Sequence, residues 1–108
     1  MRPHGACVAA IASVIAHDER TDATVGFATA LTDGVLAAQI TLLEVLPEYQ
    51  GRGIGTEFVR HLLEVLRPLY MIDVACDEHV LPFYRQLGAK QVAGAAWRDA
   101  TAVTTAET

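Results

Sequence analysis

The chain has 108 residues, of which 52% are hydrophobic and 19% are charged, and its formal net charge is −5. This length and composition predict a single globular domain over residues 1–108 with a full core, and they exclude a disordered chain. The acidic balance argues against a nucleic-acid partner, because phosphate backbones are held by basic faces. No run approaches the roughly 18 apolar residues of a membrane span, so we expect no membrane partner.

The cysteines and histidines fit no metal or redox motif. Cys7 and Cys76 lie far apart and form no Cys-x-x-Cys pair, and the four histidines show no ligand spacing such as His-Glu-x-x-His. We therefore expect no metal, two unpaired thiols in a reducing compartment, and a cytoplasmic location.

The first half of the chain predicts three strands. Residues 7–16 are small and apolar, and their place before a polar turn favours a strand over an alanine-rich helix. Residues 24–31 read as a second strand, and Thr32-Asp33-Gly34 signals a hairpin after it. Residues 35–46 then read as one long strand.

The next segment has the clearest helical pattern in the chain. Apolar residues recur at spacings of three and four and form one continuous stripe, made of Ile54, Phe58, Leu62, Val65, Leu66 and Leu69. Pro68 marks the predicted end of this helix.

Three further elements complete the predicted domain. Residues 70–76 read as a short buried strand, residues 81–87 as a helix closed by Gly88, and residues 91–97 as a last strand. Residues 99–108, rich in Ala and Thr, predict a loose tail. This order predicts an α/β or α+β domain with a mixed sheet and a ligand crevice at the carboxyl ends of the central strands.

The junction of the long strand and the first helix is the most informative segment. Residues 45–56 read VLPEYQGRGIGT, which places closely spaced glycines and an arginine just before the helix. Unpaired N–H groups and the positive dipole end converge at a helix start, so this junction predicts an anion site. Gly53 and Gly55 have no Cβ to hold a phosphate away from the backbone, so we expect a phosphate-bearing ligand.

Two familiar phosphate loops do not match these residues. The segment lacks the lysine of a Walker A loop, and Thr56 occupies the last glycine position of a dinucleotide fingerprint. The remaining pattern, Gln/Arg-x-x-Gly-x-Gly/Ala, is matched by Gln50, Gly53 and Gly55. It resembles the acetyl-CoA pyrophosphate loop of the GNAT superfamily of N-acetyltransferases.

A second motif supports the same resemblance. Phe83-Tyr84-x-x-Leu87-Gly88 is similar to the late GNAT helix, although Ala89 stands where an aromatic residue is usual. The resemblance covers residues 24–99. It implies a mixed, mostly antiparallel GNAT-like sheet with flanking helices, opened by a bulge or splay near the end of the long strand. GNAT members usually begin with a strand and two helices, so we expect an N-terminally truncated fold, in which a homodimer partner supplies the missing wall or a large acceptor binds an open groove.

The resemblance implies an acetyl-CoA site built mainly from backbone groups. Leu43 and Val45 would pair with the pantetheine arm as an added strand does. The pyrophosphate would be wrapped by the loop residues Gln50, Gly51, Arg52, Gly53, Ile54, Gly55 and Thr56. Arg52 is the only fixed positive charge in the loop, and a solvated surface arginine is the alternative interpretation of it.

The resemblance also implies direct attack of an amine on the acetyl-CoA thioester, without an acyl-enzyme. The Val45 N–H would stabilise the oxyanion, and Tyr84 would protonate the leaving thiolate, unless Tyr84 only packs beside Phe83. Asp73 is the first candidate for the base that deprotonates the acceptor, and Glu44 is the second. Gln39 stands where some family members carry a carboxylate, but an amide cannot serve as a base.

Three functions therefore stay open. The first is an acetyl-CoA-dependent N-acetyltransferase that acts on a primary amine of a small molecule, peptide or protein. The second is a non-catalytic acyl-CoA-binding module that has kept the cofactor loop. The third, a nucleotide-binding fragment of another α/β enzyme, fits neither the loop nor the Phe83-Tyr84 pair.

Overall fold

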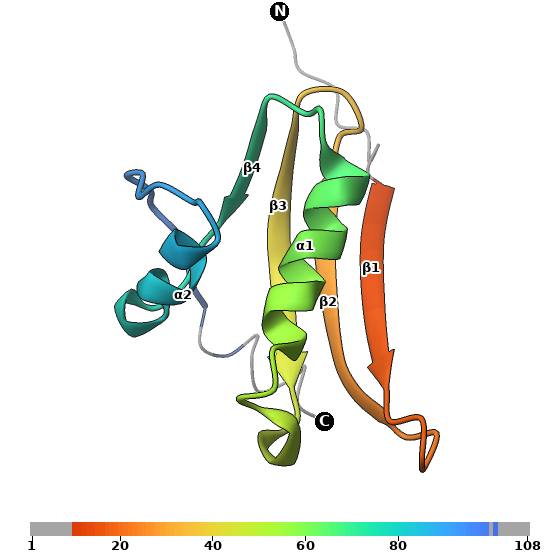
Figure 1. The fold of residues 1–108 in the computed structure, drawn as a ribbon. Coiled ribbons are helices and arrows are strands. Elements are labelled where there is room, and N and C mark those ends of the chain that lie inside the picture. The colour runs from red at the N-terminus through yellow and green to blue at the C-terminus, as the bar shows by residue number, and fades with distance from the viewer. Residues whose placement is uncertain (1–9, 100, 102–108) are drawn as a thin grey trace, which may run out of the picture. The chain divides into compact units, whose positions relative to one another are not determined.

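The structure is a computed structural model that describes residues 10–99 and 101. The chain divides into two compact units, one ending at Cys76 and the other beginning at Asp77. The first unit holds a four-stranded sheet and one long helix, as Figure 1 shows. Within the described residues, no helix is long and apolar enough to cross a membrane.

The sheet of the first unit is mixed and mostly antiparallel, as predicted. Its strands lie in the order β1-β2-β3-β4, with the first three antiparallel and β4 parallel to β3. Their bounds are Ala10–His17 for β1, Thr24–Thr32 for β2, Ala37–Val45 for β3 and Met71–Val74 for β4. The predicted strand at residues 7–16 is confirmed from Ala10 onward, and its first residues, Cys7 among them, lie outside the described part of the chain.

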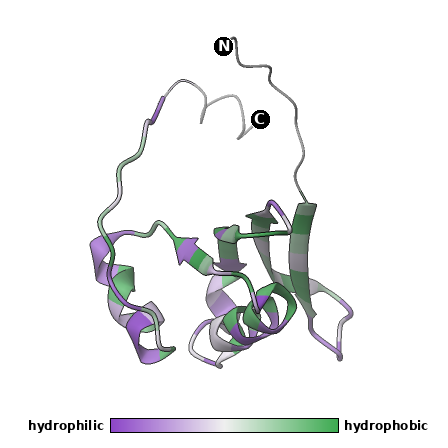
Figure 2. Ribbon diagram, turned by 90° about the horizontal axis from the view of Figure 1, so that it is seen from above, coloured by the Kyte–Doolittle hydropathy of each residue, from purple (hydrophilic) through white to green (hydrophobic). Residues whose placement is uncertain are grey.

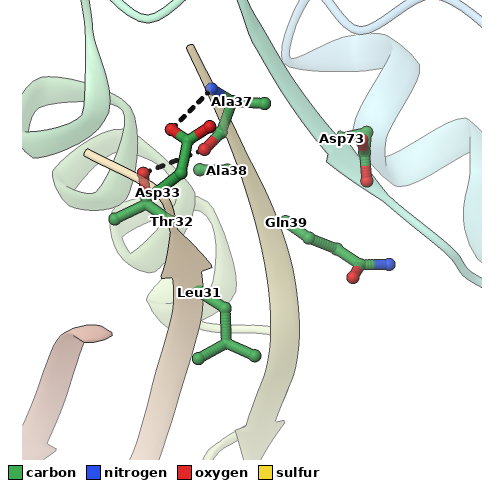
Figure 3. A pocket seen from close by; sticks show the side chains of 7 residues that line it. All are labelled: Leu31, Thr32, Asp33, Ala37, Ala38, Gln39 and Asp73. Atoms are coloured by element: carbon green, nitrogen blue, oxygen red, sulfur yellow. Dashed lines mark hydrogen bonds between the residues drawn. The ribbon is translucent and has the colours of Figure 1, made fainter. Parts of the chain in front are cut away.

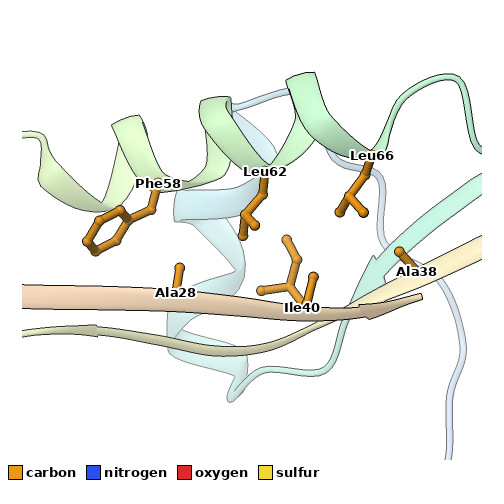
Figure 4. Packing of buried hydrophobic residues seen from close by; sticks show 7 residues of the cluster. Ala28, Ala38, Ile40, Phe58, Leu62 and Leu66 are labelled. Carbon is orange, nitrogen blue, oxygen red and sulfur yellow. The ribbon is translucent and has the colours of Figure 1, made fainter. Parts of the chain in front are cut away.

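The helix α1, Ile54–Leu66, lies on one face of the sheet and contacts β1, β2 and β3. Its buried stripe follows Phe58, Leu62 and Leu66 at a spacing of four residues, and Figure 4 shows these side chains pointing at the strands. The prediction that Val65 belongs to the stripe is wrong, because it lies on the flank of that ridge and is 68% exposed.

Small side chains on the strands let α1 approach the sheet closely. Ala28, Ala30 and Ala38 are buried beneath the helix, with Ile40 as the one larger residue of this layer. A Cβ on Gly26 would lie 2.7 Å from the Glu44 carbonyl oxygen and 3.1 Å from the Phe58 ring. Glycine at this position is therefore required by the close packing of α1 and β3.

Strand β3 carries a bulge in its middle. Thr29 pairs with Leu42 and Ala30 with Ile40, so Thr41 is the extra residue on β3. Before the bulge Ala38 and Ile40 face the core, and after it Leu43 and Val45 do so. One inserted residue therefore keeps apolar side chains facing α1 along the whole strand.

The second unit holds the short 3-10 helix η2, Glu78–Val80, and the helix α2, Leu81–Gln86. The predicted helix before Gly88 is confirmed. The predicted strand at residues 91–97 is wrong, because the structure assigns no strand there. The segment is exposed along its length and is rich in Gly and Ala, which favour strands weakly, and the exposed fraction of Trp97 is 98%. Of the predicted tail at residues 99–108, only Asp99 and Thr101 are described.

The packing of α1 leads to a prediction about stability. Leu62 is fully buried, so Leu62→Ala should lower the free energy of unfolding by about 3 kcal/mol through lost burial and the cavity left behind. Val65→Ala on the same helix is the control and should change it by less than about 0.5 kcal/mol. Urea unfolding monitored by circular dichroism measures both values, and equal losses for the two variants would contradict the observed orientation of α1.

Candidate functional site

The strands β3 and β4 part within the first unit. They pair from Ala37 opposite Met71 to Ile40 opposite Val74, and β3 then continues to Val45 without β4 beside it. The Leu46 N–H donates to the Val25 oxygen on the β2 side at 2.9 Å. Because main-chain groups alternate along a strand, those of Leu43 and Val45 face the opposite edge, which β4 leaves unpaired. This edge has the geometry to pair with an extended ligand arm.

The glycine-rich loop turns the chain sharply into α1. Gly51 and Gly53 have φ of 76° and 83°, a left-handed backbone conformation that residues with a Cβ rarely adopt. The first helical bond runs from the Glu57 N–H to the Gly53 oxygen at 3.1 Å, and no side chain caps this end of α1. The N–H groups of Ile54, Gly55 and Thr56 precede that bond and converge at the helix start, where an anion is favoured.

Side chains of the loop hold its own backbone. The Gln50 amide nitrogen donates to the Val45 oxygen at 3.0 Å, which ties the loop to the end of β3. The Arg52 guanidinium donates to the main-chain carbonyl oxygen of Glu48 at 3.1 Å and lies 4.9 Å from the centre of the Tyr49 ring. Arg52 is thus an exposed but oriented positive charge beside the helix start, as a phosphate-binding role requires.

A bond between distant residues fixes the loop to the rest of the sheet. The Tyr49 hydroxyl donates to the Asp18 carboxylate at 2.6 Å, and the Arg20 N–H donates to the other oxygen of that carboxylate at 2.8 Å. These bonds hold the pKa of Asp18 below its usual 3.8, chiefly through Tyr49, and the same bond raises the pKa of Tyr49 above 10.0. Asp18 and Tyr49 are 31 residues apart, so no local sequence pattern pointed to this contact.

A hollow of about 220 Å³ adjoins the loop on the β1 side of α1. Its wall combines apolar residues of β1 and α1 with three polar side chains, Arg52, Glu57 and His61. His61 is exposed on α1 and also lines this hollow.

A larger open pocket of about 390 Å³ lies at the other end of β3. Figure 3 shows Asp73 of β4 and Gln39 of β3 lining it, and their Cα atoms are direct partners across the two strands. The Asp33 carboxylate, also in the lining, accepts the N–H groups of Val35, Leu36 and Ala37 at 2.8, 2.8 and 3.2 Å. These three bonds lower the pKa of Asp33, the bond from Leu36 contributing most, and they keep it ionised.

Tyr84, the predicted acid, lies in the second unit. It is 7% exposed, and its ring meets that of Phe83 edge-on, with centroids 5.0 Å apart. Within the first unit, Leu43, Val45 and the loop lie at one end of β3. Asp73 and Gln39 lie together at the other end. No group of three or more His, Cys, Asp or Glu side chains suited to a metal ion occurs among residues 10–99 and 101.

Comparison with known proteins identifies the class. The sequence profile of the Acetyltransferase (GNAT) family matches residues 3–89, and the chain belongs to this family. It is 32% identical over 80 residues to an uncharacterized N-acetyltransferase, ycf52, of the alga Porphyra purpurea. That match covers 72% of this chain and 46% of the relative, so the chain spans about half the length of that protein.

Solved structures share the fold. A protein of Deinococcus radiodurans R1 assigned to the acetyltransferases is 42% identical, with a TM-score of 0.75 over 80% of this chain and 59% of that one. The enzyme AAC(6')-Iy, solved with a bisubstrate analogue that contains CoA, has a TM-score of 0.66 over 82% of this chain and 68% of its own. At 16% identity, this second likeness shows the fold alone.

The loop geometry predicts the effect of a charge at Gly53. Gly53→Glu places a carboxylate at the helix start and should raise the Kd for acetyl-CoA roughly 100-fold, because one or two charge-assisted bonds of about 1.5–3 kcal/mol each are lost. Gly34→Glu is the control: Gly34 also has a positive φ, 74°, and open space around it, but lies in the β2–β3 turn. Calorimetric titration compares the two, and equal affinities would refute the assignment of the loop.

The bond between Tyr49 and Asp18 predicts a pH-dependent stability. Because the pKa of Asp18 is lowered in the folded state, this carboxylate stabilises the fold above pH 3.8, and the stabilisation is lost as the pH falls through the folded-state pKa. Because the pKa of Tyr49 is raised, its hydroxyl stabilises the fold below pH 10.0, and that stabilisation is lost as the pH rises through the folded-state pKa of Tyr49. Tyr49→Phe should therefore lower the melting temperature at pH 7 and leave it unchanged near pH 2. A difference of the same size at both pH values would mean that ring packing, rather than the hydrogen bond, is responsible.

Proposed function

We propose that this protein is an acetyl-CoA-dependent N-acetyltransferase that transfers an acetyl group directly to a primary amine. The observation that carries the proposal is the unpaired β3 edge next to the glycine-rich start of α1. The edge suits the amide groups of a pantetheine arm, and the helix start suits a pyrophosphate. Membership of the GNAT family supports the same ligand.

The reaction forms a bond from the acceptor nitrogen to the acetyl carbon and breaks the bond from that carbon to sulfur. Negative charge develops first on the acetyl oxygen, and the Val45 N–H at the unpaired edge is the donor that we assign to it. The sulfur leaves as a thiolate and needs a proton, which we assign to the Tyr84 hydroxyl. The products are the N-acetylated amine and free CoA.

The acceptor must also lose a proton before or during attack. An alkyl amine with a pKa near 10.4 is neutral in only about one molecule in a few thousand at pH 7. We propose Asp73 as the group that takes this proton, because it lines the open pocket one residue before the strands part. Glu44, exposed on β3, is the second choice.

We also propose a cytoplasmic location and a homodimeric assembly. The cysteine usage favours the cytoplasm, and Cys76 is a free thiol in the described part of the chain. A homodimer is proposed as the source of a further wall for the acceptor. We assign no nucleic acid, membrane or metal to the reaction.

Release of free CoA tests the proposed function. The full chain, incubated with acetyl-CoA and a panel of primary amines, should release thiol above the rate without amine, and calorimetry should show acetyl-CoA binding that NAD and ATP do not reproduce. Binding of acetyl-CoA with no amine-dependent release would identify a non-catalytic acyl-CoA-binding module instead. Protection of the fold by ATP or NAD but not by CoA would identify a nucleotide-binding protein.

The role of Tyr84 gives a prediction on turnover. Tyr84→Phe removes the proposed proton donor and should lower kcat roughly 100-fold without changing the Kd for acetyl-CoA. Tyr70→Phe removes a hydroxyl from a residue that is 83% exposed and should leave both values unchanged. If the two variants turn over equally, with equal melting temperatures, Tyr84 serves packing alone.

A further inference from the structure

The sheet face turned away from α1 has a distinct order of side chains. Cross-strand partners place one residue of each strand in a single row, namely Ile11, Leu31, Gln39 and Asp73. A second row crosses β1, β2 and β3 through Ile15, Phe27 and Glu44. Both rows therefore begin with apolar residues on β1 and β2 and end with polar or acidic residues on β3 and β4.

The apolar half of this face is open to solvent. Ile11 is 70% exposed, Ile15 56%, Leu31 44% and Phe27 38%. In the hydropathy colouring of Figure 2 most of the strand ribbon is green, interrupted by purple where polar residues occur. Ile11 and Leu31 are cross-strand partners and form one exposed apolar strip, which Ser13 and Thr29 separate from Ile15 and Phe27. Exposed apolar patches mark binding surfaces more often than isolated residues do.

On β3 and β4 the two rows end in polar or acidic side chains, beside the exposed apolar residues Leu42 and Met71, and no positive side chain accompanies them. The four strands contain no Lys or Arg, and their only carboxylates are Glu44 and Asp73. Asp33 adds a third negative charge at the wall of the pocket, where its bonds to backbone N–H groups fix its position. A cation is favoured at this end of the row, and an apolar body is favoured at the other end.

The open pocket joins the two halves. Its lining contains Leu31 of the apolar half together with Gln39 and Asp73 of the polar half, as Figure 3 shows. Neighbouring strands lie about 4.8 Å apart, so Leu31 on β2 is about 10 Å from Asp73 on β4. Asp73 is one residue from the last pair before the strands part.

From this arrangement we infer that the acceptor is a primary amine attached to an apolar body, such as an arylalkylamine or a medium-length alkylamine. Its ammonium group lies at Asp73 and Gln39, and its apolar body extends about 10 Å across the sheet over Leu31 towards Ile11. Hydroxyl-rich amino sugars are disfavoured, because Leu31 and Ile11 offer no partner for their hydroxyl groups. The inference rests on the proposed function for the identity of the reaction, but the binding of the amine is independent of turnover.

Amine binding in the presence of CoA tests the inference without turnover. For the full chain, saturation-transfer NMR and calorimetry should show that 4-phenylbutylamine binds, whereas 4-phenylbutanol and glucosamine bind at least tenfold more weakly. Leu31→Gln should weaken the binding of 4-phenylbutylamine about tenfold, because the ligand loses an apolar contact worth roughly half the burial of a leucine side chain. Asp73→Asn should remove the preference for the amine over the alcohol.

Matched variants make the test decisive. Val65→Gln changes an exposed apolar residue on α1 and should leave amine binding unchanged, while Ile11→Gln repeats the test on β1 if Leu31→Gln fails to fold. Equal binding of glucosamine and 4-phenylbutylamine, or unchanged affinity in both face variants, would overturn the inference. Amine binding as predicted without any acetyl-CoA binding would support this surface and reject the proposed function. Acetyl-CoA-dependent turnover with glucosamine, but not with 4-phenylbutylamine, would support the proposed function and reject this surface as the acceptor site.

Discussion

The parting of β3 from β4 is the constraint on which the rest of the first unit depends. The two strands pair from Ala37 to Ile40, and β3 then continues alone on that side. Unpaired main-chain groups are stable only if water or a ligand satisfies them, so this edge suits an extended arm with amide groups of its own. The bulge at Thr41 lies where the strands part and keeps Leu43 and Val45 packed on the core. The parting therefore does not disrupt the hydrophobic face.

The proposed anion site is a consequence of the same geometry. Because β3 runs directly into the loop, the end of its unpaired edge lies next to the start of α1. The bond from Gln50 to the Val45 oxygen holds these two features together, and the bond from Tyr49 to Asp18 fixes the loop to the β1–β2 turn. Burial of Phe58 and Leu62 then sets the direction of the helix and of its N–H groups. These contacts fix the unpaired edge and the helix start relative to each other.

Periodicity and motifs predicted the strands, both helices and the loop, because each depends on residues close in sequence. The alternating burial of β2 and the stripe from Phe58 to Leu66 are features of this kind. Long-range packing decided the rest. Whether Val65 is buried depends on where the sheet meets α1, and whether residues 91–97 form a strand depends on pairing partners that their own sequence does not specify. The pairing of Gln39 with Asp73 and the row through Leu31 depend on strand register, which the sequence does not contain locally.

The most direct test of the central claim is a titration of the isotope-labelled protein with acetyl-CoA, followed through its backbone amide NMR signals. If the unpaired β3 edge and the start of α1 form one ligand site, the largest shifts fall on Leu43, Val45 and the amides from Gly53 to Thr56. The amides of Ala28 and Ala30, on the paired interior of β2, should then move little. Saturable binding that leaves Leu43, Val45 and Gly53 unshifted would contradict the claim.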